Sequence, residues 1–161
     1  AIYAPFPLEG EPRLLLWSYD GLLAFYTLAG EQLAAAPADG TAINGVALAP
    51  GGGKLVVYAA DGSAIIYANS SWVPLWRLDA AHNFVADLLI GAGWLDDYTL
   101  LLLDRSGLLQ LVSMPDATGD IAITPLARLG EGERLAAAAG VAGGRLLTAG
   151  YADGGGGSLR L

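Results

Sequence analysis

Four aspartates each stand just ahead of a glycine in short polar breaks between apolar runs. They are Asp20 in Y-D-G, Asp61 in A-D-G, Asp104 in D-R-S-G and Asp153 in A-D-G. Carboxylates repeated in this way could form a ring that holds a cation or a polar substrate. Aspartate is also favoured in tight turns, because its side chain accepts hydrogen bonds from nearby backbone N–H groups. Repetition at equivalent turns is what turn chemistry predicts, so we interpret all four as structural turn residues.

His82 is the only histidine in the chain, and an imidazole can act as a general base. Such catalysis requires a nucleophile and an acid that orients the ring, and the sequence presents no such pair for His82. We therefore predict no catalytic residue, no enzyme activity and a structural role for His82.

Two further features have the composition of ligand sites. Asp96 and Asp97 are adjacent carboxylates, but a calcium ion takes about 6–8 oxygen ligands, more than one turn supplies. The glycine clusters at 51–53 and 154–157 lack the Lys-Ser/Thr and the following helix of a phosphate-binding loop. The sequence therefore predicts a solvated turn at the first feature, and no metal and no cofactor at either.

Three tryptophans, Trp72, Trp76 and Trp94, are candidates for a protein-binding surface, because aromatic anchors dominate protein interfaces. The alternative is that they pack inside the fold, since a buried tryptophan removes a large apolar area from water. We expect at least two of them to lie between packed sheets and keep all three as possible interface aromatics.

The charge of the chain limits its partners. The 161 residues carry 8 basic and 16 acidic side chains, for a net charge of −8 at pH 7. A nucleic-acid-binding protein needs clustered positive charge to displace counterions, and the basic residues here are spread singly. The sequence therefore predicts protein partners and no nucleic acid.

The apolar runs are all short, far below the roughly 18 residues that cross a bilayer as a helix. The first residues, A-I-Y-A-P-F-P, lack the basic and apolar regions of a secretory signal. We expect no membrane insertion and a cytoplasmic location. The absence of cysteine excludes disulfides and thiolate metal sites.

Short apolar segments separated by Gly, Pro and Asp predict strands rather than helices. Residues 1–12 hold three prolines and are expected to be an extended lead-in. The alanine-rich residues 135–141 favour a helix by propensity, but a seven-residue helix is marginal, and the flanking glycines indicate a strand. The expected strands cover 13–19, 22–28, 32–36, 43–49, 54–59, 63–68, 72–78, 86–93, 98–103, 108–113, 121–129, 135–141, 145–149 and 158–161.

These strands fall into units, because the intervals between successive turn aspartates are 41, 43 and 49 residues. A period of roughly 40–50 residues with several short strands per unit is typical of β-propeller blades. We predict an all-β fold, a β-propeller segment of about three and a half four-stranded blades, in one domain spanning 1–161. The blades are expected at about 13–40, 41–80, 81–130 and 131–161, the first without its innermost strand.

The spacing resembles that of WD-repeat propellers. In that family a histidine precedes the first strand of a blade and an aspartate stands in the turn between the second and third strands. His82 lies 22 residues before Asp104, which fits the family. Five residues past each turn glycine, where the family has Trp, stand Tyr26, Tyr67 and Val112. The Trp-Asp dipeptide is absent, and Gly-His is reduced to Ala81-His82.

The resemblance implies that His82 links its loop to Asp104 by hydrogen bonds, and that partners bind the flat faces and rim of the propeller. A propeller closes with about 4–8 blades, so we expect the missing blades to come from the rest of a longer chain, a partner or a second copy. The leading hypothesis is a non-enzymatic protein–protein interaction scaffold within a larger multi-subunit assembly, for example of vesicle-tethering, ciliary or nuclear-pore type. The alternatives are a cofactor- or sugar-binding propeller of quinoprotein-like type and a self-associating repeat chain.

Overall fold

A computed structural model describes residues 2–6, 13–36, 41–69, 71–115, 119–128, 133–141, 145–152 and 157–160. Within these ranges the chain forms β-strands and one short 3-10 helix, η1 (Ala80–His82). No helix in this described part has the length and apolarity needed to cross a membrane. The all-β fold class predicted from the sequence is confirmed.

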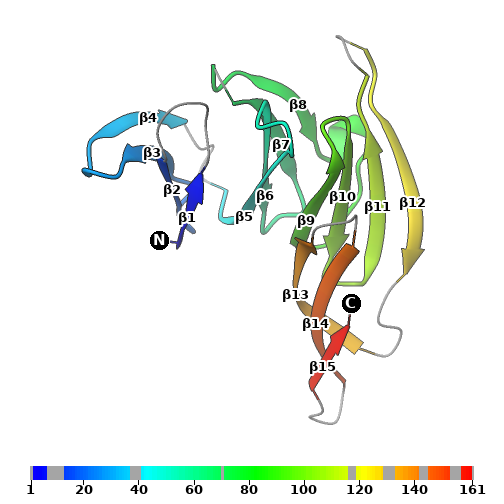
Figure 1. Cartoon of the computed structure of the whole chain (residues 1–161). Coiled ribbons are helices and arrows are strands. Elements are labelled where there is room, and N and C mark those ends of the chain that lie inside the picture. Colours follow the sequence, from blue (N-terminus) through cyan, green and yellow to red (C-terminus); the bar gives the residue numbers. More distant parts are fainter. Residues whose placement is uncertain are drawn as a thin grey trace.

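The strands form four antiparallel sheets, each drawn from one continuous stretch of chain (Figure 1). The first sheet contains β1 (Ile2–Phe6), β2 (Arg13–Trp17), β3 (Leu23–Thr27) and β4 (Gln32–Ala36). The second contains β5 (Ile43–Leu48), β6 (Lys54–Ala59), β7 (Ala64–Ala68) and β8 (Pro74–Leu78). The third contains β9 (Leu89–Asp96), β10 (Thr99–Asp104), β11 (Leu108–Ser113) and β12 (Ala122–Arg128). The fourth contains β13 (Glu133–Val141), β14 (Arg145–Ala152) and β15 (Gly157–Arg160).

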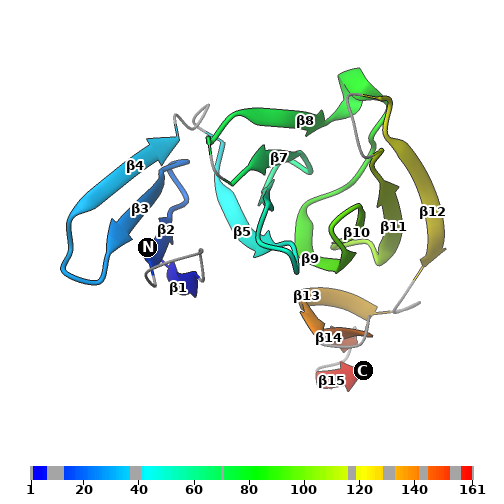
Figure 2. The same cartoon turned by 45° about the horizontal axis from the view of Figure 1, so that its top comes forward.

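The sheets stand radially, with the first strand of each unit innermost. In Figure 2 the strands β5, β9 and β13 surround the centre, and β8 and β12 lie on the outside. The strand β9 lies against both β5 and β13. Consecutive four-stranded meanders arranged in this way form a β-propeller. The described residues therefore form a partial propeller, as the period of the sequence predicts.

The first sheet contains a strand that the sequence did not predict. Ile2 pairs with Trp17 and Phe6 pairs with Arg13, so β1 is the innermost strand of this sheet. The expectation of a lead-in without an innermost strand is therefore wrong. Its prolines caused the error, but an edge strand tolerates a residue that has no N–H to donate.

Two other strands begin at least two residues later than expected. The strand β8 begins at Pro74 and not at residue 72, because Trp72 has a left-handed backbone with φ of 57°. The strand β9 begins at Leu89 and not at residue 86, because residues 84–88 run as a connection over neighbouring turns. The alanine-rich segment is the strand β13, as predicted from its glycine spacing.

Two separate apolar clusters hold neighbouring sheets together. Both involve β6, because its successive side chains point to opposite faces of the sheet. Val56 and Tyr58 belong to the cluster between the second and third sheets, whereas Leu55 and Val57 belong to the cluster between the first and second. Complete burial of one such side chain contributes roughly 1.5–3 kcal/mol. The largest fully buried members of the former cluster are Phe84, Ile66, Leu78, Leu89, Leu100 and Leu102. Those of the latter cluster are Phe25, Leu15, Leu23 and Leu55.

Gly62 joins the second sheet to the connection that precedes the third. Its φ is +84°, in the region that side chains other than glycine rarely adopt. A Cβ atom at this position would also lie 2.5 Å from the Ala86 carbonyl oxygen and 2.7 Å from that of Asp87. The turn therefore needs glycine both for its own geometry and for contact with the next unit.

Gly62→Ala is expected to lower the free energy of unfolding by about 2–4 kcal/mol, because backbone strain and a backbone clash coincide. The matched control is Gly30→Ala, since Gly30 has φ of +88° but no neighbour within 4 Å of its Cβ position. The control substitution is expected to lower the free energy of unfolding by about 1 kcal/mol, from backbone strain alone. Urea unfolding of the three proteins measures the difference, and equal losses would contradict the role of the contact.

Candidate functional site

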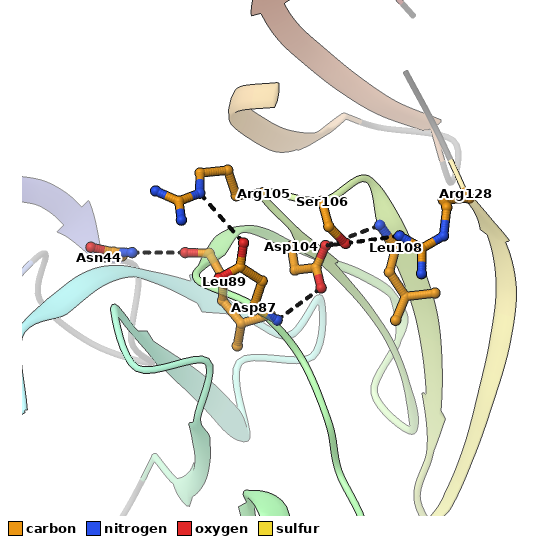
Figure 3. Close-up of polar contacts among 8 residues, drawn as sticks. All are labelled: Asn44, Asp87, Leu89, Asp104, Arg105, Ser106, Leu108 and Arg128. Carbon is orange, nitrogen blue, oxygen red and sulfur yellow. Dashed lines mark hydrogen bonds and ion pairs between the residues drawn. The ribbon is translucent and has the colours of Figure 1, made fainter. Parts of the chain in front are cut away.

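Asp104 is the most buried carboxylate among the described residues, with 2% of its surface exposed. It ends β10, and its Oδ1 accepts hydrogen bonds from Ser106 Oγ at 2.7 Å and Leu108 N at 3.0 Å. Its Oδ2 accepts one from Asp87 N at 2.9 Å (Figure 3). A buried carboxylate is costly unless it is hydrogen-bonded. These three donors satisfy Asp104, which joins its turn to the preceding connection.

The connection at residues 84–88 is attached to the β10–β11 hairpin at further points. Gln110 Nε2 donates to Val85 O at 3.1 Å, and Arg105 N donates to Leu88 O at 2.8 Å. Arg105 Nε lies 3.4 Å from Asp87 Oδ2, in an ion pair that is about half exposed (Figure 3). An exposed pair of this kind adds little to stability. The backbone and Gln110 bonds therefore hold the connection.

His82 does not lie where the family resemblance implies. Its Nδ1 is 2.7 Å from Asp79 Oδ1, and its backbone N–H donates to the same oxygen at 3.2 Å. Asp79 is the N-cap of η1, and the hydrogen bond from His82 holds the pKa of the Asp79 carboxyl below its usual value. The implied hydrogen bond to Asp104 is wrong, because Asp87 N takes that place. The D-x-x-H spacing at 79–82 is the capping signal that sequence reasoning missed.

The other turn aspartates bond within their own turns. Asp61 Oδ1 accepts from Ser63 N at 2.9 Å and from Ser63 Oγ at 2.7 Å. The hydroxyl of Ser18 donates to Asp20, and this bond keeps the pKa of the exposed Asp20 carboxyl below its usual value. Asp153 lies outside the described residues. No cluster of three or more metal-ligating side chains occurs in the described part of the chain.

Asp97 connects two sheets, which the sequence pattern did not indicate. Its Oδ1 accepts from Gly51 N at 2.6 Å, and its carbonyl accepts from Lys54 Nζ at 2.8 Å. Lys54 Nζ also lies 4.1 Å from the centre of the Tyr98 ring. Asp96 caps the turn instead, accepting from Tyr98 N at 2.7 Å, and this bond lowers the pKa of the Asp96 carboxyl. The pair is therefore more than a solvated turn.

The three tryptophans are half-buried. Trp72 packs on Phe25 of the first sheet, with ring centres 3.5 Å apart at 34°. Trp94 Nε1 donates to Ala47 O of the second sheet at 3.0 Å. Both contacts cross between neighbouring sheets. Trp76 packs against the cluster between the second and third sheets from its outer side.

Trp76 also lines a groove of about 470 Å³ on the outside of the molecule, between β8, η1 and the approach to β12. Both apolar and charged side chains line the groove. Its lining includes Leu75, Trp76, Arg77, His82, Asp120 and Ile121. The described residues thus offer packing and docking surfaces, with each turn carboxylate engaged in structural hydrogen bonds.

Comparison with known proteins identifies the fold. No protein-family model matches the chain, and no curated protein matches its sequence. Solved structures do match. The β-propeller domain of Cps50 (Swd1) from Myceliophteria thermophila has a TM-score of 0.70 and 13% identity, over 90% of this chain and 49% of that chain. The WD40 repeats of RRP9 have a TM-score of 0.70 and 14% identity, over 91% of this chain and 47% of that one.

The chain has the fold of a WD40-repeat β-propeller segment. A chain of the Chaetomium thermophilum Polycomb Repressive Complex 2 is also similar, with a TM-score of 0.68 and 14% identity over 94% of this chain and 34% of that chain. The WD40-type segment therefore spans less than half the length of these solved chains. Its aspartate-turn period places it in this fold, although the Trp-Asp dipeptide is missing.

Proposed function

We propose that this WD40-type propeller segment is a non-enzymatic scaffold that binds protein partners within a multi-subunit assembly. The main support for this proposal is the outward face of the first sheet, which is the face turned away from the second sheet. Leu15, Trp17 and Phe25 point toward the second sheet. Because successive strand residues alternate between faces, Leu14 and Leu16 point the other way.

That outward face is apolar. Leu14 is paired with Tyr26, and Leu16 with Ala24, which in turn is paired with Ala35. Leu14, Leu16 and Tyr26 are partly exposed, whereas Ala24 between them is fully buried. In Figures 1 and 2 the second sheet lies on one side of the first, and no other sheet of the described chain covers its opposite side. A contiguous apolar face of this kind is typical of a protein-interaction surface.

We expect a further propeller blade to cover this outward face, because propeller blades stack face to face. The similar WD40 chains are more than twice as long as the stretch matched here. One of them belongs to a protein complex by its description. These observations support a scaffold completed by the rest of a longer chain, by a partner or by a second copy. Vesicle-tethering, ciliary or nuclear-pore assemblies remain our prediction for its setting.

Mass spectrometry of the protein from its source, denatured and native, tests the proposal. A denatured mass well above 16.5 kDa would assign the further blades to the same chain. A native mass of twice that value would assign them to a second copy, and co-purifying subunits would assign them to a partner. A stable, soluble species of 16.5 kDa found alone would contradict the proposal.

A charge on the outward face provides the matched test. Leu16→Glu is expected to weaken the association at least about tenfold, since burying an unpaired carboxylate costs more than about 1.4 kcal/mol. Leu22→Glu is the control, because Leu22 is exposed in the turn before β3. An equal effect of the two substitutions would place the association elsewhere.

A further inference from the structure

The outermost strand of each four-stranded sheet carries one β-bulge, and each bulge holds an exposed leucine. In β4 the extra residue is Leu33. It lies between Gln32, which pairs with Tyr26, and Ala34, which pairs with Phe25. In β8 it is Leu75, and in β12 it is Leu126. Their side chains are 43%, 40% and 50% exposed. The same apolar residue therefore recurs at the rim of three successive blades.

Two of these bulges share a sequence. Residues 74–77 are P-L-W-R and residues 125–128 are P-L-A-R, so a proline precedes the leucine and an arginine follows two residues later. The bulge disturbs the regular ladder, and the proline removes one N–H group. Both features prevent another strand from adding to the edge. A partner at this rim must therefore contact side chains and satisfy its own backbone, as a helix does.

The outer strands carry a charge opposite to that of the whole chain, although Asp120 also lines the groove between β8 and β12. The strands β4, β8 and β12 contain none of the 16 acidic residues of the chain. The exposed Arg77 is the last residue but one of β8, and the exposed Arg128 is the last residue of β12. Arg128 Nη1 donates to Ser106 Oγ at 3.2 Å, which orients its guanidinium beside the hairpin of Asp104 (Figure 3). Arg77 borders the groove that Leu75 and Trp76 line. A partner with carboxylates beside its apolar side chains complements this surface.

We propose that the rim of β8 and β12 docks an amphipathic helix of a protein partner whose apolar stripe is flanked by Asp and Glu. One apolar side chain of the helix enters the groove beside Trp76, and its carboxylates face Arg77 and Arg128. Leu75 and Leu126 supply the apolar contacts on the rim. This proposal rests on the scaffold function and names the class of partner that the rim takes.

A displayed library of peptides of about 18 residues, roughly 27 Å long as helices, tests this proposal. The library mixes acidic, basic and extended sequences, and the 161-residue chain is the bait. We expect selection of acidic helical peptides with leucine at positions i, i+3, i+4 and i+7. Selection of basic or extended peptides, or of none, would overturn the proposal.

The selected peptides are then measured by fluorescence anisotropy against rim variants whose folding is checked by circular dichroism. Leu75→Ser and Arg77→Glu are each expected to weaken binding at least about tenfold, as central interface residues do. The effect of Arg77→Glu should shrink at high salt. Leu33→Ser is the control, because its bulge lacks the arginine, and should change binding less than about twofold. Binding that survives both Leu75→Ser and Leu126→Ser would overturn the proposal.

Different results would overturn the scaffold proposal and the proposal of a rim site for a helix. Peptides whose binding is lost with Leu16→Glu but kept with Leu75→Ser would overturn the rim site and support the scaffold through its outward face. Failure to select any peptide, together with a lone 16.5 kDa species in the native mass spectrum, would overturn both.

Discussion

Asp104→Ala is expected to lower the free energy of unfolding by about 3–5 kcal/mol. Its carboxylate accepts from Asp87 N, Leu108 N and Ser106 Oγ, and its truncation leaves all three donors without this acceptor. Each buried donor that loses its partner costs about 1–3 kcal/mol. Chemical unfolding gives the loss, and hydrogen exchange locates it. The amides of Asp87 and Leu108 should lose protection first.

Two matched variants separate this role from ordinary turn chemistry. Asp61→Ala should cost about 1 kcal/mol, because Asp61 is exposed and bonds only to Ser63 of its own turn. Asp104→Asn should fall between the two, since one side-chain oxygen still accepts while the amide nitrogen faces a donor. If Asp61→Ala and Asp104→Ala cost the same, the link from Asp104 to Asp87 contributes nothing beyond the turn.

Phe25→Ala should detach the first sheet from the second, at a cost of about 3–5 kcal/mol, the usual range for a buried phenylalanine. Phe25 is 1% exposed, belongs to the cluster between these sheets and contacts the ring of Trp72. In a repeat fold each unit packs only on its neighbours, so stability is lost locally. Hydrogen exchange should show lost protection in residues 13–36 while residues 89–113 remain protected.

Leu102→Ala is the control for that prediction. Leu102 is fully buried in the other cluster, between the second and third sheets, so its truncation should lose about 2–5 kcal/mol. Its loss of protection should fall on residues 54–113 and spare the first sheet. Uniform loss in both variants would mean that the sheets unfold as one cooperative unit and that the two clusters are coupled.

The turns and the repeat period of the fold could be predicted from local sequence patterns alone. Gly21 and Gly62 directly follow their turn aspartates, and Gly107 lies three residues after Asp104. All three have positive φ, the conformation that glycine supplies in hairpin turns. Alternating and continuous apolar runs between these turns predicted the strands of all four sheets except β1. The alanine-rich β13 was also predictable, because its flanking glycines matched those of β5.

The strand β1 could not be predicted, because three prolines within residues 1–12 indicate an extended lead-in. Its pairing with β2 exists only because an edge position tolerates Pro5. The boundary of β8 was likewise decided by the left-handed backbone of Trp72, which packs its ring on Phe25. Neither outcome follows from neighbouring residues alone.

The partners of the polar side chains were decided by the tertiary structure. Asp104 binds Asp87 N, and His82 binds Asp79, although spacing alone allowed His82 and Asp104 to meet. Asp97 binds Gly51, which is 46 positions away, and no local pattern encodes such a contact. A turn forms from short-range backbone preferences that adjacent residues specify. A hydrogen bond between blades depends on how whole sheets pack, which the sequence specifies only through the complete fold.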